Sequence, residues 1–370
     1  MTRVHRLGVL GGGQLARMLA LAAAPLGIRV RALDPDPDAC AGDACELACG
    51  GFDDEDALLR FASGLDAATY EFENVPASAV EFLADRLSIR PGAASLHASQ
   101  DRAREKAVLA DAGFDVAPWA CVDDQASLHD AVRDIGAPAI LKTRTGGYDG
   151  KGQARIAHAG DASDAWASIG RRPAIAEARI NFERELSLVA VRSESQFAAY
   201  PLVENAHRGG ILRVTRAPAC DADHLQRGAK AQARALMDAL GHVGVLAIEF
   251  FEVGGRLVAN EFAPRVHNSG HWTIDAAATS QFENHVRAVA GLPLGPTTPL
   301  GPAVMLNCIG RMPDAAAVLT HPDAALHDYR KRPRPGRKVG HVTVRGEHDP
   351  AELVRAFGID LTGNDERVGG

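Results

Sequence analysis

The 370-residue sequence lacks the features of a membrane, secreted or nucleic-acid-binding protein. No apolar run approaches the roughly 20 residues that a membrane-spanning helix needs, and the alanine-rich stretch around residue 20 does not have the layout of a signal peptide. Lys and Arg number 40 against 47 Asp and Glu, a formal charge of -7. Nucleic-acid and membrane-surface binders usually carry a basic excess. We therefore expect a cytoplasmic protein without nucleic-acid or membrane partners, in which local cations hold any bound anion.

Cysteine is also scarce, with six residues in the whole chain. Cys40, Cys45 and Cys49 form a cluster, but no histidine stands near them, so they lack the ligand set of a structural zinc site. We interpret them as free thiols in a reducing compartment. The sequence contains no internal repeat and no low-complexity segment.

The length of the chain and a hydrophobic content of 46% suit two or three domains, each with its own core. Residues 6–34 show the pattern strand, glycine turn, helix, strand, and a second unit of this kind ends in "TYEFENVP". This alternation predicts an α/β domain with an open parallel sheet over roughly the first 95 residues.

The character of the sequence changes from Ser99 onward. A helix is expected from Ser99 to Gly113, with Asp101 near its start and Ser99 as the candidate cap. The strand "PAILK", the glycine-rich basic loop "KTRTGGYDGKGQ" and a clear hairpin with Gly254-Gly255 at its turn follow, which indicates an α+β region. A proline-rich stretch near residue 295 then leads into a last segment.

The first glycine cluster has the spacing G-x-G-x-x-A at Gly11, Gly13 and Ala16, and Asp34 ends the next strand. Three interpretations are open: a dinucleotide site with Asp34 on the ribose, tight packing of strand against helix, or a single phosphate at the helix N-terminus. We favour the single phosphate, with the amide of Gln14 beside it.

Cations in the middle of the chain predict a site for a nucleoside triphosphate. Arg102 and Lys106 lie one helical turn apart, so their charged ends share a face. Lys142 ends an apolar strand, where a charge is costly unless an anion meets it, and Lys151 lies in the glycine-rich loop. Acidic residues follow at Glu177 and Glu185, around a short connection suited to an adenine edge and ribose hydroxyls, with His207 beyond them.

The hairpin predicts a metal site, because Glu249 and Glu261 interrupt its apolar strands and buried carboxylates are costly unless paired or metal-bound. A two-residue turn at Gly254-Gly255 would place Asn260 opposite Glu249 and turn Glu261 to the other face. A longer loop or a bulge would bring both glutamates onto one face, so we expect the longer loop. Solvated acids on an edge strand are the alternative.

Directly after the hairpin, "RVHNSGH" concentrates polar side chains and predicts a pocket for a small anion, formed by Arg265, His267, Asn268, Ser269 and His271. The last basic cluster surrounds "RPGRK" and consists of Lys331, Arg334, Arg337 and Lys338. On an acidic protein this cluster is either a solvated basic turn or a phosphate clamp.

Five segments resemble the N5-carboxyaminoimidazole ribonucleotide synthetases, the ATPase subunits of bacterial phosphoribosylaminoimidazole carboxylase and members of the ATP-grasp superfamily. They are "GGGQLARM", "TYEFENVP", "RTGGYDGKGQ", "NEFAPRVHNSGHWT" and "RPGRKVGH". They occur in the family's order over nearly the whole chain. Ala16 is a departure, since the family usually has glycine there, and it should leave the Gln14 amide free.

The resemblance implies an ATP-grasp fold in three parts and a homodimer. The parts are a Rossmann-like pre-ATP-grasp domain at 1–98, an ATP-grasp domain at 99–298 with a lid subdomain at about 116–176, and a C-terminal domain at 299–370. It implies a ligase that uses ATP and Mg²⁺, with Mn²⁺ as an alternative metal, to join bicarbonate to 5-aminoimidazole ribonucleotide through carboxyphosphate in purine (IMP) biosynthesis.

The resemblance also implies site residues. Those for ATP are Arg102, Lys106, Lys142, Gly147, Tyr148, Asp149, Gly150, Lys151, Gly152, Gln153, Glu177, Ala178, Arg179, Ile180, Glu185, His207, Asn260 and Glu261. Those for the ribonucleotide are Gly13, Gln14, Leu15, Glu73, Asn74, Tyr148, Lys331, Arg337 and Lys338. The metal ligands are Glu249 and Glu261, and the residues of the carboxylation site are Glu73, Arg265, His267, Asn268 and Ser269, with Glu73 or His267 as the proton acceptor.

Two other functions are compatible with parts of the sequence. A formate-dependent glycinamide ribonucleotide transformylase shares the ATP-grasp architecture. An NAD-dependent oxidoreductase or a nucleotide sensor without turnover could be built on the first αβ unit, but neither the paired glutamates nor the second glycine loop would have a role in an oxidoreductase.

Overall fold

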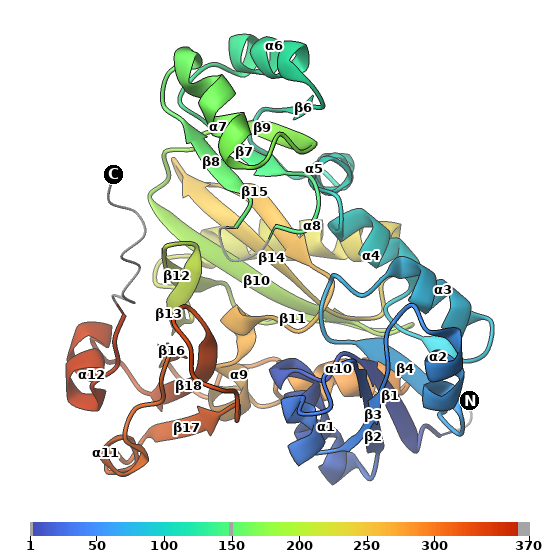
Figure 1. Ribbon diagram of the computed structural model, residues 1–370. Coiled ribbons are helices and arrows are strands. Elements are labelled where there is room, and N and C mark those ends of the chain that lie inside the picture. Colours follow the sequence, from blue (N-terminus) through green and yellow to red (C-terminus); the bar gives the residue numbers. More distant parts are fainter. Residues whose placement is uncertain (1–2, 148–150, 362–370) are drawn as a thin grey trace.

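The computed structural model describes residues 3–147 and 151–361. Its N-terminal part contains a five-stranded parallel sheet in the order β3-β2-β1-β4-β5, drawn in blue in Figure 1. The strands are β1 (Arg6–Leu10), β2 (Arg29–Asp34), β3 (Glu46–Cys49), β4 (Ala67–Tyr70) and β5 (Ser88–Ile89), and the helices are α1 (Gln14–Ala23), α2 (Glu55–Ala62), α3 (Ala77–Ala84) and α4 (Ala93–Ser99).

Apolar side chains on both faces of this sheet explain its two helical layers. Leu7 and Val9 pack with α1 and with α10 (Gln281–Val289) from much later in the chain, whereas Leu10 and Leu33 pack with α2 and α3. Strands buried on both faces are typical of parallel sheets. The predicted α/β domain is therefore confirmed, and α10 completes its core.

A nine-stranded sheet forms the centre of the molecule, in the order β15-β14-β10-β12-β13-β16-β18-β17, with β11 paired to β10. Its neighbouring strands are antiparallel. The strands are β10 (Arg184–Arg192), β11 (Phe197–Ala199), β12 (Val203–Arg208), β13 (Ile211–Ala217), β14 (Gly244–Val253), β15 (Arg256–Ala263), β16 (Ala303–Ile309), β17 (Ala324–Asp328) and β18 (Lys338–Arg345).

Helices cover this central sheet at both ends. Near β10 and β14 the cover is α5 (Arg102–Asp111) and α8 (Asp223–Ala239), whose apolar faces share one core with these strands. Near β16 and β18 it is α11 (Ala315–Leu319) and α12 (Pro350–Phe357). The last segment of the chain thus extends the sheet of the middle region, through the pairing of β13 with β16, rather than forming a sheet of its own (Figure 1).

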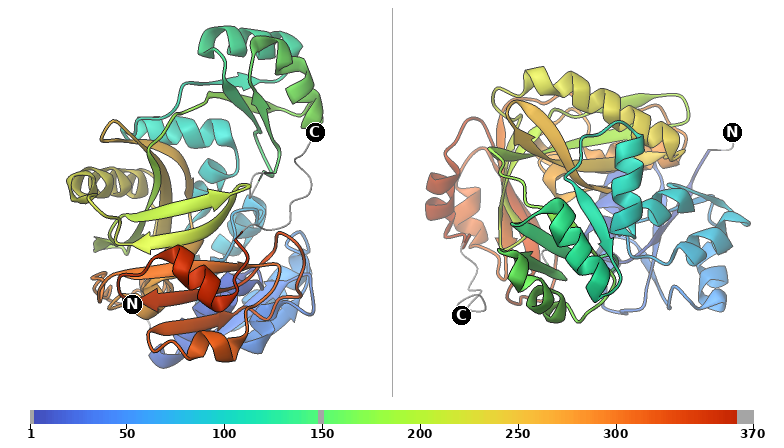
Figure 2. Two further views of the ribbon diagram at one scale, coloured as in Figure 1. Left: turned by 90° about the vertical axis from the view of Figure 1, so that its left-hand side faces the viewer. Right: turned by 90° about the horizontal axis from the view of Figure 1, so that it is seen from above.

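A third, four-stranded sheet has the order β6-β9-β7-β8 and its own core around Leu128, Leu141 and Trp166. It lies at the top of Figure 1 and stands apart from the other layers in the left view of Figure 2. Its elements are β6 (Trp119–Val122), α6 (Gln125–Ile135), β7 (Ala139–Thr143), β8 (Gln153–Ile156), α7 (Ala162–Ser168) and β9 (Ala174–Ala178).

The helix expected from Ser99 is divided in the structure. Helix α4 ends at Ser99, and α5 begins at Arg102 with Asp101 as its cap. The Asp101 carboxylate accepts the amides of Ala103 and Arg104 and also binds Arg144. The expectation that Ser99 caps this helix was wrong, because Asp101 satisfies two of the unpaired amides of the first turn.

The described residues contain no helix that is both long and apolar enough to cross a membrane. All six cysteines lie in the described ranges, and each is a free thiol, as expected.

Candidate functional site

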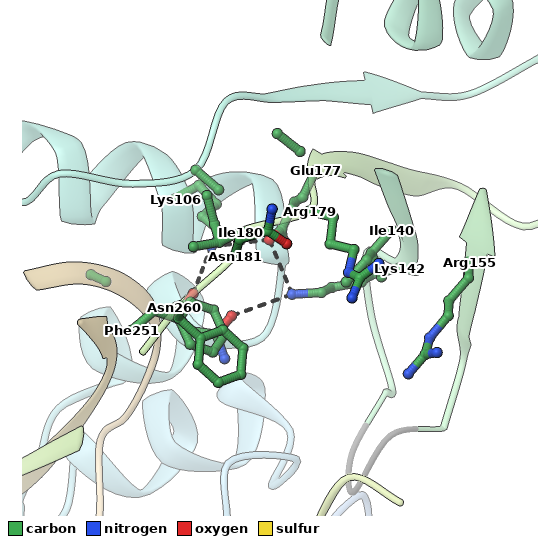
Figure 3. Close-up of a pocket in the computed structure, with 14 residues that line it drawn as sticks. Lys106, Ile140, Lys142, Arg155, Glu177, Arg179, Ile180, Asn181, Phe251 and Asn260 are labelled. Atoms are coloured by element: carbon green, nitrogen blue, oxygen red, sulfur yellow. Dashed lines mark hydrogen bonds and ion pairs between the residues drawn. The ribbon is translucent and has the colours of Figure 1, made fainter. Parts of the chain in front are cut away.

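A cavity of about 380 Å³ lies between the four-stranded sheet and the edge of the central sheet, and Figure 3 shows the side chains that line it. Lys142 comes from β7, Glu177 from β9, Lys106 from α5 and Asn260 from β15. The lining also includes three residues that the sequence predicted, Ala178, Arg179 and Ile180. Five further lining residues are Ile140, Arg155, Asn181, Phe182 and Phe251.

A carboxylate shared by two lysines forms the floor of this cavity. Glu177 Oε2 lies 3.0 Å from Lys142 Nζ and 3.3 Å from Lys106 Nζ, and all three side chains are buried. Burial alone would raise the pKa of Glu177, but the two ammonium groups hold it below its usual value. Its other oxygen, Oε1, is buried without a hydrogen-bond partner among the described residues. The charged carboxylate therefore has one acceptor position left for a ligand.

The lysines are also bound to Asn260. Lys106 Nζ donates to the backbone oxygen of Asn260 at 2.7 Å, and Lys142 Nζ donates to its side-chain oxygen at 3.3 Å (Figure 3). Burial lowers the pKa of Lys106, and the charge of Lys142 lowers it further, against the pull of Glu177. Two buried ammonium groups that share one carboxylate leave excess positive charge, which favours an anionic ligand.

Part of the cavity lining is apolar. The rings of Phe182 and Phe251 are stacked with centroids 4.6 Å apart, and Phe182 is 44% exposed. Ile140 and Ile180 line the same cavity. An exposed aromatic stack beside apolar side chains suits a planar ring system.

The glutamates of the hairpin do face each other, but through a different geometry from the one expected. Val253 pairs with Arg256, so the turn has two residues, and both of its glycines adopt positive φ angles, +56° and +71°. The register shifts next to Glu249, so that Glu249 pairs with Glu261. The expected longer loop was wrong; a bulge at Asn260 brings the carboxylates together.

The two carboxylates differ in their surroundings. Glu261 Oε2 binds Arg102 Nη1 at 3.0 Å; burial would raise the pKa of Glu261, but Arg102 and Lys142 lower it to about 2. Burial and the charge of Glu261 raise the pKa of Glu249 to about 7. Without a cation the pair therefore keeps a proton near neutral pH. Two carboxylates beside an amide oxygen form a donor set that a hard divalent cation fits.

Polar residues after β15 continue the site. His267 Nε2 lies 3.5 Å from Glu249 Oε1, and its Nδ1 lies 2.8 Å from Ser269 Oγ. Burial and the nearby Arg265 lower the pKa of His267 to about 3, so the imidazole is neutral. Arg265 forms an ion pair with Glu73, which lies in the turn after β4. Burial would raise the pKa of Glu73, but Arg265 lowers it.

Three backbone amides of the first glycine cluster already bind carboxylates of the protein, so they are not available to a phosphate. Gly12 N–H donates to Asp34 at 2.7 Å, and the amides of Gly13 and Ala16 donate to Glu71 at 2.6 and 2.9 Å. A Cβ on Gly13 would lie 2.5 Å from a Glu71 oxygen. The glycines thus permit the close approach of internal carboxylates, and Asp34 is already bound to the turn, which argues against a dinucleotide site.

The side chain of Gln14 remains at the tip of this turn, and Lys331 Nζ donates to its oxygen at 2.8 Å. Burial lowers the pKa of Lys331, and repulsion from Arg337 and Lys338 lowers it further. A cluster of cations that repel one another on an acidic protein favours an anion. Leu15 has its side chain in the core, so only its backbone can reach a ligand.

The remaining predicted residues lie around these groups. Glu185 binds His207 at 2.8 Å, and both line a small cavity next to Glu249 and Asn260. Asn74 is exposed beside Glu73, and Gly152 and Gln153 precede or begin β8. Tyr148, Asp149 and Gly150 lie outside the described residues.

The lining residues Ile140, Arg155, Asn181, Phe182 and Phe251 were not predicted from the sequence, and neither was Glu71. Arg155 on β8 points into the cavity (Figure 3), and alternation along that strand could have indicated it. Phe251 lies two residues after Glu249 on β14, and in the sequence nothing distinguishes it from a core residue. Glu71 follows a buried strand at the C-terminal edge of a parallel sheet, where ligand-binding residues are typical, yet it binds the turn of its own domain.

Similarity to known proteins covers most of the chain. The ribonucleotide synthetase preATP-grasp domain matches residues 4–100, the ATP-grasp domain 107–282, and the phosphoribosylaminoimidazole carboxylase C-terminal domain 303–354. The N5-carboxyaminoimidazole ribonucleotide synthase of Pseudomonas aeruginosa is 49% identical over 341 residues, which cover 92% of this chain and 94% of the relative.

Solved structures agree with this similarity. The N5-carboxyaminoimidazole ribonucleotide synthetase from Thermus thermophilus aligns with a TM-score of 0.89 and 52% identity over 95% of both chains. The N5-carboxyaminoimidazole synthase from Aspergillus clavatus, in complex with ADP and 5-aminoimidazole ribonucleotide, aligns with a TM-score of 0.87 and 32% identity over 96% of this chain and 97% of that one.

Proposed function

The chain belongs to the family of N5-carboxyaminoimidazole ribonucleotide synthases, enzymes of the ATP-grasp superfamily, and on this premise we propose how its residues carry out the ATP-dependent carboxylation of 5-aminoimidazole ribonucleotide. The observation that carries the proposal is that polar groups adjoin one another across the site. Lys142 in the cation-lined cavity binds Asn260, the next residue Glu261 faces Glu249 across the hairpin, and Glu249 lies beside His267.

We propose that ATP occupies the 380 Å³ cavity. The adenine ring would lie in the apolar slot near Phe182 and Phe251, with an edge toward the unpartnered oxygen of Glu177. The phosphates would replace Glu177 as the counter-charge of Lys106 and Lys142. Glu185, held by His207, is placed for the ribose hydroxyls. The loop at 147–153 would close over the phosphates, with Lys151 adding a charge.

Glu249 and Glu261 would hold Mg²⁺ beside the phosphates, with Asn260 between them. Their fit rests on the donor set, two carboxylates that face each other beside an amide oxygen. A cation at this point would remove the repulsion that raises the pKa of Glu249. When bound, the metal would neutralise charge on the β- and γ-phosphates. Arg102 stays bound to Glu261 and orients it.

The second substrate would bind on the other side of the glutamates. Lys331, Arg337 and Lys338 would hold its 5′-phosphate together with the Gln14 amide. Its amine would then point toward the carboxylation site, which consists of Glu73, Arg265, His267, Asn268 and Ser269.

The reaction proceeds in two steps in this arrangement. A bicarbonate oxygen, placed by Arg265, attacks the γ-phosphorus of ATP, and ADP leaves with the electrons of the broken P–O bond, which gives carboxyphosphate. The amine nitrogen then forms a bond to the carboxyl carbon, or to CO₂ released from it, and inorganic phosphate leaves. The lost proton goes to Glu73 or His267, and both are unprotonated at neutral pH. Arg265 lowers the pKa of Glu73 against the effect of burial, and burial together with Arg265 lowers the pKa of His267. Exclusion of water by the closed loop protects the carboxyphosphate.

We also propose the three-part division at 98/99 and 298/299, with the lid at about 116–176, and a cytoplasmic homodimer. The lid sheet has a core of its own, which supports its movement as a unit. Light scattering of the purified chain would test the dimer.

The function is tested by ADP release from purified protein. With ATP, bicarbonate and 5-aminoimidazole ribonucleotide, we expect equal amounts of ADP and carboxylated product. With formate and glycinamide ribonucleotide we expect neither. ADP release only in the formate reaction would make the chain a transformylase, and the absence of substrate-stimulated hydrolysis in both reactions would favour a nucleotide sensor.

A further inference from the structure

The segment between β17 and β18 carries the proposed phosphate clamp. Tyr329 lies at the start of this segment and pairs with its far end. The Tyr329 amide donates to Val339 O at 2.9 Å. Lys331 follows two residues later, and Lys338 begins β18. The Tyr329 side chain is 1% exposed, so it packs behind the clamp residues and does not contact the substrate.

The hydroxyl of Tyr329 connects two parts of the site. It lies 2.7 Å from Nδ1 of His341 on β18 and 3.0 Å from Nδ1 of His271. His271 directly follows the turn Asn268–Gly270, which carries the proposed carboxylation residues. One buried hydroxyl thus joins the clamp segment to the carboxylation loop.

Hydrogen-bond directions in this network can be assigned from a fixed end. Asn307 Nδ2 donates to the backbone oxygen of Leu212 at 2.9 Å, so its side-chain oxygen accepts from Asn268 Nδ2 at 3.0 Å. The second hydrogen of Asn268 Nδ2 points to His271 Nδ1 at 3.1 Å.

The Tyr329 hydroxyl joins the two histidines by hydrogen bonds. It has one proton, so it donates to one of the two Nδ1 atoms and accepts from the other. Burial lowers the pKa of both histidines well below 6.5, so both are neutral. One Nδ1 is therefore protonated and the other is not, and the hydrogen-bonded connection between them depends on the tyrosine hydroxyl.

His341, at the other end of the hydrogen-bond network, is held by a stacked histidine. The ring of His327 stacks on that of His341, with centroids 4.3 Å apart and planes 10° apart, and Asp275 binds His327 at 2.9 Å. These three side chains bring possible metal ligands within 4.8 Å of one another. The nearly parallel rings, however, hold their nitrogen lone pairs in separate planes, which do not meet at one ion. The stack serves to hold His341 in place.

We propose that Tyr329 is a positioning residue for the carboxylation step, which rests on the proposed function. Its hydroxyl sets the spacing between the clamp residues Lys331 and Lys338 and the loop from Arg265 to Ser269. The distance from phosphate to amine is fixed by the covalent structure of the ribonucleotide. A change of about 1 Å in the spacing therefore weakens phosphate binding or misaligns the amine. The rate of carboxylation can then fall by up to about a hundredfold.

The test compares Tyr329→Phe with the wild type and with the matched control Tyr200→Phe. Tyr200 is equally buried, and its hydroxyl also makes two hydrogen bonds, to Thr279 O and Asn284 Nδ2, away from the clamp. For Tyr329→Phe we expect kcat/KM for the ribonucleotide to fall about tenfold or more, with excess ADP over carboxylated product and an unchanged KM for ATP. Tyr200→Phe should keep all three values within about twofold at a similar loss of Tm.

The possible results distinguish a failure of the proposed function from a failure of the role of Tyr329. A wild type that does not form carboxylated product overturns the proposed function itself. A wild type that does, together with Tyr329→Phe and Tyr200→Phe variants that change equally, makes Tyr329 a merely structural residue and overturns this inference. If Tyr329→Phe does not fold, His341→Asn, whose amide keeps a hydrogen-bonding group near the Nδ1 position, should preserve the coupling of ADP to product. His341→Leu should lose it, and equal coupling in the two would contradict the role.

Discussion

The nucleotide-free enzyme should become more stable when Glu249 is replaced by glutamine. In the folded protein burial and the facing Glu261 raise the pKa of Glu249 from 4.5 to about 7, while the unfolded chain has the ordinary value. The folded state therefore binds more protons between these pH values, so the free energy of unfolding decreases as pH rises from about 4.5 to about 7. Glu249→Gln removes this loss because an amide does not titrate.

The size of the effect follows from the same shift. A carboxyl whose pKa changes this much loses about 3 kcal/mol when fully ionised, at 1.36 kcal/mol per pH unit. The Glu249 side chain is 19% exposed, and water reduces the penalty, so we expect a gain of about 2 kcal/mol for the variant at pH 8 and almost none at pH 4.5.

Thermal and urea unfolding in EDTA at several pH values would measure this gain. Glu252→Gln is the matched control, because Glu252 lies on the same strand and is buried, but it binds Arg184 at 2.5 Å; loss of that charge should destabilise the protein. With Mg²⁺ in place of EDTA, Glu249→Gln should abolish ATP turnover, and Mg²⁺ with ADP should stabilise only the wild type. A variant that is no more stable than the wild type at pH 8 would show that the facing carboxylates do not repel, and near-normal turnover would remove Glu249 from the metal site.

Three further substitutions test other parts of the site. Lys331→Met should raise KM for the ribonucleotide at least about tenfold and leave KM for ATP unchanged, because a charge-assisted contact to phosphate is lost; equal losses for both substrates would indicate a folding defect. Arg265→Ala should abolish carboxylation while ADP still binds in calorimetry, and unchanged product formation would exclude it from the bicarbonate site. Glu177→Gln leaves Lys106 and Lys142 without a counter-charge and should lower the free energy of unfolding by about 3 kcal/mol in urea; ATP should restore part of it, and an equal loss with and without ATP would contradict phosphate contacts of these lysines.

Much of the fold could be predicted because the relevant patterns are local. The strand–turn–helix periodicity indicated the parallel sheet, and Gly254-Gly255 indicated the hairpin turn. The boundary between α4 and α5 was missed, because helical periodicity continues across Asp101 and only the capping hydrogen bonds mark the break. Nor could periodicity show that β16 joins β13, since strand pairing over about 90 residues leaves no local pattern.

Candidate site residues were easier to find than the contacts between them. Charged residues inside apolar strands, such as Lys142 and Glu249, are conspicuous in a sequence because burial of a charge needs a reason. The residue that binds each buried charge cannot be recognised from the sequence in the same way. Glu177 was expected at an adenine edge, and in the structure its first role is to hold two lysines. Tyr329 was overlooked entirely, since a buried tyrosine at a strand end has no local signature of the histidines it binds.

The bulge at Asn260 shows why geometry at this site had to come from the structure. With a regular two-residue hairpin, strand alternation would have separated Glu249 from Glu261 by the thickness of the sheet. One extra residue reverses the alternation only beyond the bulge, so the apolar residues nearer the turn keep their faces while Glu261 moves beside Glu249. The same extra residue frees the Asn260 side chain and backbone oxygen to accept from Lys142 and Lys106. A single local irregularity thus produces both the carboxylate pair and its connection to the cation-lined cavity, which is why we expect deletion of Asn260 to separate the two even if the hairpin still forms.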